Sequence, residues 1–366
     1  MENKEYLNKQ IITYLGNKRS LLDEIEEEII KIKEKLNKEK ITACDLFSGS
    51  GIVARMLKQH CTKIIANDLE DYSYLINRCY LSNKKDFNFA EYNKYLNYLL
   101  YKCQSEPYEG IITKTYAPKD ENNITTEDRV FYTRENSIFI DSFRKHLEDV
   151  PLPYKDFLLC QLVTEASIHT NTSGVFKGFY KSRETGLGMY GGIGQNALKR
   201  IKGKIEIKSP VFSEYESEYL VTKMDAIELA KQIVADVVYI DPPYNQHPYG
   251  SNYFMLNVII NNAITSEISK VSGIPNNWNR SVFNYKKSAL YSFEKIISDL
   301  KTSYIVISYN NEGFITYEQM VNMLKKYGKV EARRIKYNTF RGSRNLRERN
   351  LYTNEYLFIL EKEKQI

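Results

Sequence analysis

The segment from residue 41 to residue 69 constrains the fold of this chain more than any other. An apolar run at 41–47 ends in the glycine turn 48–51, and apolar residues from 53 to 57 then recur at helical spacing. A second apolar run follows at 63–69. The order of strand, glycine turn, helix and strand predicts a β-α-β unit, the building block of parallel sheets.

Alternating patterns elsewhere extend this unit to a larger α/β fold. Apolar residues at spacings of three and four predict a helix from Ser20 to Leu36, with Ser20 and Asp23 as a capping pair. Later patterns predict strands at 237–240, 304–309, 330–337 and 355–361, and helices at 290–300 and 316–327.

The stretch between these two parts is irregular. It contains a polar segment at 119–128 and a glycine-rich segment at 174–194, with helical spacing near 157–168. We therefore expect one domain made of residues 1–82 and 212–366, and an inserted region at 83–211 with helices of its own.

Composition excludes several classes of protein. Among 366 residues, 42% are hydrophobic and 27% charged, values typical of a globular protein with a sizeable core. The five cysteines show no CxxC spacing and only four histidines occur, so we expect neither a metal site nor disulfides. The polar N-terminus and the absence of a long apolar stretch predict a cytoplasmic protein without a membrane span.

The net charge of +6 is concentrated near the C-terminus. Seven basic residues and one acidic residue lie between 333 and 349, which equals the excess of the whole chain. Such a concentration favours a phosphate-binding surface. A solvated surface loop is the alternative.

The glycine turn is typical of a ligand site, because open parallel sheets bind ligands beyond the carboxyl ends of their strands. Glycines there allow the backbone to approach a ligand. Asp68, about twenty residues further on, is placed to accept both hydroxyls of a ribose. The turn has no complete GxGxxG motif and no P-loop lysine follows it, so a ribose-bearing ligand without phosphates is favoured. Taken by itself, the turn is explained equally well as a simple connection between a strand and a helix. The candidate ligand-binding residues in this turn are Asp45, Phe47, Gly49 and Gly51.

A second ligand segment, Tyr14 to Lys18, precedes the first long helix. Lys18 offers a cation for a carboxylate and Tyr14 offers an aromatic face, although a surface turn explains the composition as well.

The catalytic candidate is Asp241-Pro242-Pro243-Tyr244, directly after the apolar run 237–240. Consecutive prolines remove two N–H donors and restrict the backbone, which fixes a carbonyl and a carboxylate in direction. Two such acceptors suit the two hydrogens of an exocyclic amine, and Tyr244 suits stacking on a base. A rigid proline turn is the structural alternative.

Together with Asp225 and the strand 307–310, these motifs resemble the amino-methyltransferases of DNA, in the motif order of the Dam-like alpha class of adenine-N6 enzymes. The resemblance implies a Rossmann-like fold that uses S-adenosylmethionine, with a mostly parallel sheet, an antiparallel last strand and target recognition in the insertion 83–211. It implies that Tyr14, Lys18 and Asp68 contact the cofactor and that Asp225 faces its adenine. It further implies that Asp241 and Tyr244 hold the target base, and Asp at this position favours adenine over cytosine.

Candidate DNA contacts come from three segments. The loop after the catalytic segment contributes Asn245, His247 and Tyr249, and the basic segment contributes Lys336, Asn338, Arg341 and Arg344. From the insertion, the candidates are Lys177, Lys181, Arg183, Lys199 and Arg200, with the amides of Asn171, Gln195 and Asn196.

The sequence therefore predicts a monomeric, site-specific DNA adenine-N6 methyltransferase that acts on a flipped-out adenine of double-stranded DNA. It would serve a restriction-modification system with a separate cognate endonuclease, or act without one. Methylation of cytosine N4 in DNA, methylation of adenine N6 in RNA, and DNA binding without catalysis remain the alternatives.

Overall fold

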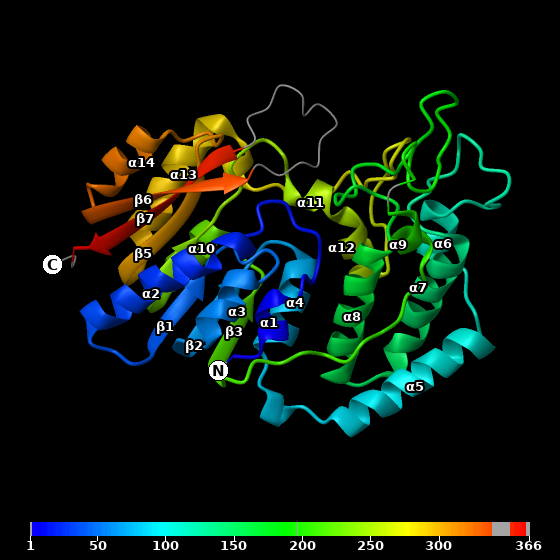
Figure 1. Ribbon diagram of the computed structural model, residues 1–366, viewed down its shortest axis with the longest axis horizontal. Coiled ribbons are helices and arrows are strands. Elements are labelled where there is room, and N and C mark those ends of the chain that lie inside the picture. Colours follow the sequence, from blue (N-terminus) through cyan, green and yellow to red (C-terminus); the bar gives the residue numbers. More distant parts are fainter. Residues whose placement is uncertain (1, 196, 339–351, 364–366) are drawn as a thin grey trace.

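A seven-stranded sheet forms the centre of the computed structural model, which describes residues 2–195, 197–338 and 352–363 (Figure 1). The strand order is β3-β2-β1-β4-β5-β7-β6. The strands are β1 (Ile41–Asp45), β2 (Cys61–Asn67), β3 (Glu218–Thr222), β4 (Val234–Ile240), β5 (Lys301–Asn310), β6 (Gly328–Asn338) and β7 (Tyr352–Lys362).

Strand direction confirms the predicted fold class. Strands β1 to β5 pair in parallel, whereas β7 lies antiparallel between β5 and β6. The last strand of the chain is thus inside the sheet, next to its central strands. Its register pairs Ser308 of β5 with Leu357, and Asn310 with Glu355.

Both faces of the sheet are covered by helices, because neighbouring strand residues point to opposite faces. Ala43, Val237 and Val306 pack with α2 (Leu22–Leu36) and α3 (Ile52–Lys58). Cys44 and Val238, one position on, pack with the helices of the other face. These helices are α10 (Ala226–Ala230), α13 (Lys286–Asp299) and α14 (Tyr317–Leu324).

Beside the sheet lies a predominantly helical region (Figure 1). The almost fully buried helix α8 (Tyr154–Ile168) is near its centre and packs on α4 (Asp71–Leu81) and α12 (Phe254–Asn261). One core cluster joins these helices to residues near the N-terminus. The other helices on this side are α1 (Lys4–Asn8), α5 (Phe89–Ser105), α6 (Ile111–Tyr116), α7 (Arg134–His146), α9 (Leu198–Lys202) and α11 (Tyr249–Asn252).

Two local expectations differ from the structure. The helix expected from Ser20 starts as a 3-10 turn, Arg19–Leu21, and α2 itself begins at Leu22. No side chain caps its first turn, so the predicted Ser20 cap is wrong.

Within the described ranges, no helix has both the length and the apolar character needed to cross a membrane.

Candidate active site

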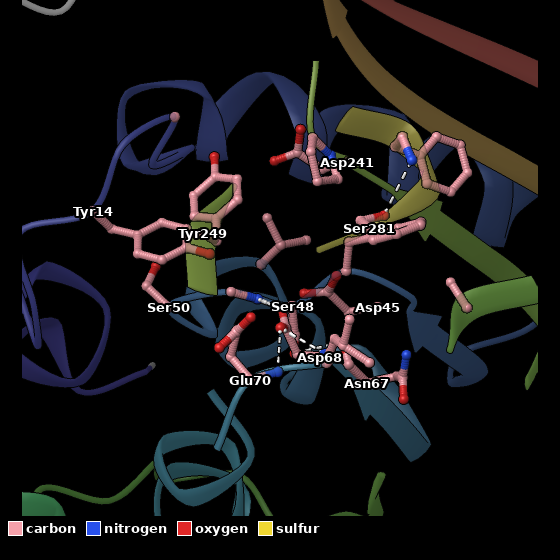
Figure 2. A pocket seen from close by; sticks show the side chains of 18 of the residues that line it. Tyr14, Asp45, Ser48, Ser50, Asn67, Asp68, Glu70, Asp241, Tyr249 and Ser281 are labelled. Atoms are coloured by element: carbon pink, nitrogen blue, oxygen red, sulfur yellow. Dashed lines mark hydrogen bonds between the residues drawn. The ribbon is translucent and has the colours of Figure 1, made fainter. Parts of the chain in front are cut away.

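A cleft lies at the carboxyl ends of β1, β2 and β4 (Figure 2). It brings together motifs that are far apart in the sequence. Lys18 lies on the N-terminal segment, Asp45 is the last residue of β1, and Asp68 and Asp241 directly follow β2 and β4. All the residues that the sequence associates with the cofactor, except Gly51, line this cleft.

The glycine turn forms the floor of the cleft next to an aromatic side chain. Gly49 has φ +50°, and an added Cβ atom would lie 2.7 Å from the Tyr14 ring. Gly51 has φ +74°, and its Cβ would lie 2.7 Å from the Asn77 side-chain oxygen. Both positions need glycine for conformation and for space.

Two carboxylates hold this turn in place. Asp68 Oδ2 accepts a hydrogen bond from Gly49 N at 2.8 Å, and its Oδ1 accepts from the backbone N–H groups of residues 69 and 70. Asp45 Oδ2 accepts from Ala54 N at 3.0 Å, which ties the end of β1 to α3. Burial raises the pKa of both carboxyl groups.

The opposite wall contains the predicted adenine-facing residue. Asp225 caps α10, accepting a hydrogen bond from Ile227 N at 2.9 Å. Phe47 lies nearby with its ring edge against Phe283, at a centroid distance of 5.4 Å. This wall combines a flat apolar surface with one exposed carboxylate.

A stack of tyrosines closes the cleft on the side of the helical region. The Tyr14 ring stacks on Tyr249 and on Tyr253, each with a centroid distance of 5.0 Å. The Tyr249 hydroxyl donates to Leu15 O at 3.0 Å, and Leu15 N donates to the Tyr253 hydroxyl at 2.7 Å. The tyrosines of α11 and its flank therefore fix the segment that carries Tyr14 and Lys18.

Lys18 lies at the centre of a buried charged network. Its Nζ atom is 3.2 Å from Asp241 Oδ1 and 3.1 Å from Glu355 Oε1, and it donates to the Tyr244 hydroxyl at 2.8 Å. The Tyr244 hydroxyl lies within hydrogen-bonding reach of both carboxylates, and its single proton can be donated to either of them. Ser308 Oγ donates to Glu355 Oε1 at 2.7 Å.

Burial and charge act in opposite directions on this network. Burial raises the pKa of Asp241, Lys18 lowers it, Glu355 raises it again, and the resulting pKa is about 6. Burial alone would lower the pKa of Lys18, but Asp241 and Glu355 hold it above its usual value. At neutral pH the centre therefore contains a charged lysine beside an ionised Asp241.

Comparison with known proteins decides the family. The model of the family described as D12 class N6 adenine-specific DNA methyltransferase matches residues 14–323. The chain belongs to this family. It is a DNA methyltransferase of the adenine-N6 type, and the Dam-like resemblance read from its motifs is confirmed.

Its relatives include type II methyltransferases. The methyltransferase is 31% identical over 362 residues to type II methyltransferase M.NlaIII of Neisseria lactamica, covering 96% of this chain and 99% of the relative. It is 33% identical over 330 residues to M.CviAII of Paramecium bursaria Chlorella virus 1, covering 88% and 90%. It is 26% identical to M.FokI of Planomicrobium okeanokoites, covering 96% of this chain and 52% of that one.

The residues of the predicted catalytic segment, 241–244, lie in different surroundings in this methyltransferase. Pro242 is buried, and Pro243 and Asp241 line the cleft. The Tyr244 ring packs against Tyr309 at a centroid distance of 4.7 Å, with its hydroxyl directed to the carboxylates. Stacking of Tyr244 on a target base stays a prediction.

Predicted DNA contacts lie in several environments. Asn245 and His247 are exposed on the loop after the catalytic segment, whose Asn245 carbonyl accepts from Asn284 Nδ2 at 2.8 Å. Tyr249, also predicted to contact DNA, lines the cleft described above. Lys336 is an exposed residue of β6, which ends at Asn338, and Arg341, Arg344 and Asn196 lie outside the described residues.

Lys177, Lys181 and Arg183 extend along the glycine-rich segment. Lys177 is exposed and lines a second hollow, between residues 10–13 and 167–180. The Lys181 ammonium lies 4.9 Å from the centre of the Phe179 ring, and Arg183 is exposed. Lys199 and Gln195 are also exposed.

Two other candidates from the insertion bond to the protein backbone in this structure. Asn171 is fully buried, and its side chain bonds the backbone of Val130, Met189 and Gly191. Arg200 is half-buried and donates to the carbonyls of residues 168, 170 and 172. Both side chains thus satisfy backbone groups of the glycine-rich segment, and their contact with DNA stays a prediction.

Sequence reasoning missed two members of the charged network, Glu355 and Ser308. The sequence pattern predicted Glu355 only as the first residue of a strand, whereas its side chain is buried, with 2% exposure. The sequence signal that could have identified Glu355 is its position directly before the apolar run 356–360. Such a carboxylate, if buried, requires a cationic or hydrogen-bonding partner elsewhere in the chain.

Proposed function

We propose that this methyltransferase uses S-adenosylmethionine to methylate N6 of an adenine flipped out of duplex DNA, at one recurrent sequence. The observation that carries the proposal is the asymmetry of the Asp241 carboxylate. Its Oδ1 contacts Lys18 and Tyr244, whereas its Oδ2 has no hydrogen-bond partner among the described residues of the cleft. One carboxylate oxygen is therefore anchored and the other is available to a substrate.

The residues of the cleft fit the proposed cofactor. The glycine turn leaves a backbone surface that a Cβ atom would fill, and Asp45 Oδ1 is buried without a partner in the described part of the chain. Tyr14, Asp68 and Phe47 supply an aromatic face, a hydroxyl acceptor and an apolar wall. Bound S-adenosylmethionine supplies a methyl group activated by its sulfonium sulfur. The residues proposed to hold it are Tyr14, Lys18, Asp45, Phe47, Gly49, Gly51, Asp68, Asp225 and Asp241.

The protein's own part in the reaction is to raise the nucleophilicity of the amine. The N6 lone pair of adenine is delocalised into the ring. Acceptors on the amine hydrogens, which we assign to Asp241 Oδ2 and the backbone carbonyl of the Pro-Pro segment, favour a pyramidal nitrogen with a localised lone pair. The rigid prolines preserve this orientation, and an Asp241 pKa of about 6 keeps the acceptor ionised at neutral pH.

Duplex DNA would lie across the opening of the cleft. Support comes from the exposed Asn245 and His247 at its edge and from Lys177 in the second hollow, which adjoins the chain leading to Tyr14. The basic segment with Lys336, Arg341 and Arg344 suits phosphate contacts. We infer that it protects DNA against a separate cognate endonuclease, because the relatives named above are type II methyltransferases. A monomer stays the expectation.

Asp241→Ala tests the function directly. Removal of the carboxylate should lower the methylation rate at least about 1,000-fold, because an acceptor used in the transition state is lost. DNA from cells expressing the wild type should carry N6-methyladenine at one recurrent motif in long-read modification mapping.

Asp23→Ala is the matched control, because Asp23 is an exposed residue of α2 outside the cleft. It should methylate as the wild type does, and circular dichroism should show all three proteins folded. Wild-type levels of methylation by Asp241→Ala would refute the assignment.

A further inference from the structure

Glu355 is a buried carboxylate at the start of β7 that points into the charged network. Its Oε1 atom accepts hydrogen bonds from Ser308 Oγ at 2.7 Å and from the Tyr244 hydroxyl at 2.9 Å. The same atom lies 3.1 Å from Lys18 Nζ. Glu355 is 2% exposed and Lys18 4% exposed, so water does little to screen these contacts.

Burial of a carboxylate is costly unless donors compensate for it. Here the compensating donors include both residues that hold Asp241, namely Lys18 and Tyr244. The single hydroxyl proton of Tyr244 has two carboxylates within reach, and the Lys18 ammonium lies almost equally far from both, at 3.1 and 3.2 Å. Asp241 and Glu355 thus share one cation and one hydroxyl.

We propose that Glu355 is a positioning residue for methyl transfer, which fixes Lys18 and Tyr244 and prevents Lys18 from neutralising Asp241 completely. The inference rests on the proposed function. In this arrangement Asp241 Oδ1 is locked in place, while Oδ2 retains enough negative charge to accept strongly from the amine of the target base. Glu355 itself does not touch the substrate.

The charges around Asp241 give this role a measurable consequence. Burial raises the Asp241 pKa, Lys18 lowers it and Glu355 raises it. Asp45 of the β1 end, Tyr239 of β4 and Tyr249 of α11 also face Asp241 and remain unchanged in a Glu355 variant. Without the charge of Glu355, Lys18 would serve Asp241 alone. The Asp241 pKa would then fall, and its carboxylate would become a weaker acceptor.

The test is Glu355→Gln, measured as the single-turnover rate of DNA methylation between about pH 5 and 8. The wild-type rate should decline below about pH 6 as Asp241 becomes protonated. In Glu355→Gln the acid limb should move to lower pH, and the plateau rate should fall about tenfold. The rates are measured at saturating cofactor, because Lys18, which Glu355 contacts, is also proposed to hold the cofactor.

Two further variants separate charge from packing. Ser308→Ala removes one hydrogen bond to Glu355 but no charge, so it should lower the rate less and leave the acid limb in place. Glu361→Gln, an exposed carboxylate on the same strand, should behave as the wild type.

An unchanged rate and an unchanged acid limb in folded Glu355→Gln would overturn the inference, and so would a lower rate without movement of the acid limb. If Glu355→Gln does not fold, Glu355→Asp retains the charge and shortens the reach. It should then keep the acid limb while losing rate, and a wild-type rate would overturn the positioning role. A wild-type protein that does not methylate DNA would instead refute the proposed function.

Discussion

At the scale of single residues, the glycine turn gives a sharp test of the cofactor site. Gly49→Ala would introduce a Cβ atom 2.7 Å from the Tyr14 ring at φ +50°, so either the turn or Tyr14 must move. We expect the free energy of unfolding to fall by about 1–2 kcal/mol, because the left-handed conformation is strained for alanine. Cofactor affinity, measured by calorimetry, should fall about tenfold, equivalent to about 1.4 kcal/mol.

Gly178→Ala is the control for this change, since a Cβ at Gly178 meets nothing within 4 Å and its φ is not in the left-handed region. It should leave cofactor affinity intact. Equal affinities for the wild type and Gly49→Ala would show that the turn does not form part of the cofactor site.

The residues of the site differ in how far the sequence could predict them. Asp45, Asp68 and Asp241 each lie at the end of an apolar run. Because parallel strands bring their carboxyl ends to one edge of a sheet, the local sequence pattern was enough to predict that these three residues share a cleft. Glu355 was not predictable in this way. Its partner Tyr244 is 111 positions away, and their contact depends on where β7 enters the sheet.

At the scale of elements, the glycine-rich segment depends on one buried amide. Asn171 donates to Val130 O at 2.7 Å and Met189 O at 3.1 Å, and it accepts from Gly191 N at 3.0 Å. Asn171→Ala should lower the free energy of unfolding by about 1–3 kcal/mol, because buried backbone groups lose their partners. DNA affinity should fall about tenfold if this segment contacts DNA.

The readouts are a chemical denaturation curve and a DNA titration monitored by fluorescence anisotropy. Asn93→Ala, on the exposed side of α5, is the control and should alter neither. Unchanged DNA affinity for a folded Asn171→Ala protein would remove the glycine-rich segment from the DNA-binding surface.

Buried elements were easier to predict from the sequence than exposed ones. Strands β1, β4 and β5 were recognised from their buried apolar runs, although β4 and β5 begin three residues earlier than predicted, in positions that are less buried. The edge strand β3 (Glu218–Thr222) was missed because its apolar run is only three residues long, Tyr219 to Val221, and the strand is largely exposed. The start of α2 was misjudged because Ser20 lies in a preceding 3-10 turn.

At the scale of the whole molecule, the predicted insertion shares its core with the predicted catalytic part. Phe131, Phe143 and Leu158 belong to the same buried cluster as Tyr72 of α4 and Leu256 of α12. Replacing residues 83–211 by a short linker would expose these faces of α4 and α12. We expect the shortened protein to lose cooperative unfolding and to aggregate.

Thermal unfolding and light scattering measure both properties. Removal of residues 122–127, a mostly exposed loop, is the control and should leave the transition cooperative. A soluble, cooperatively folding protein without residues 83–211 would show that the two parts fold independently.

The position of β7 has a consequence for the synthesis of the protein. A ribosome completes residues 352–362 after all the other strands, yet β7 lies between β5 and β6 and carries Glu355 to Lys18. Until then, β6 has no neighbour to join and the charged network lacks one carboxylate. The charged network is therefore complete only after Glu355, on the last strand to be synthesised, reaches Lys18 of the segment that precedes the first strand.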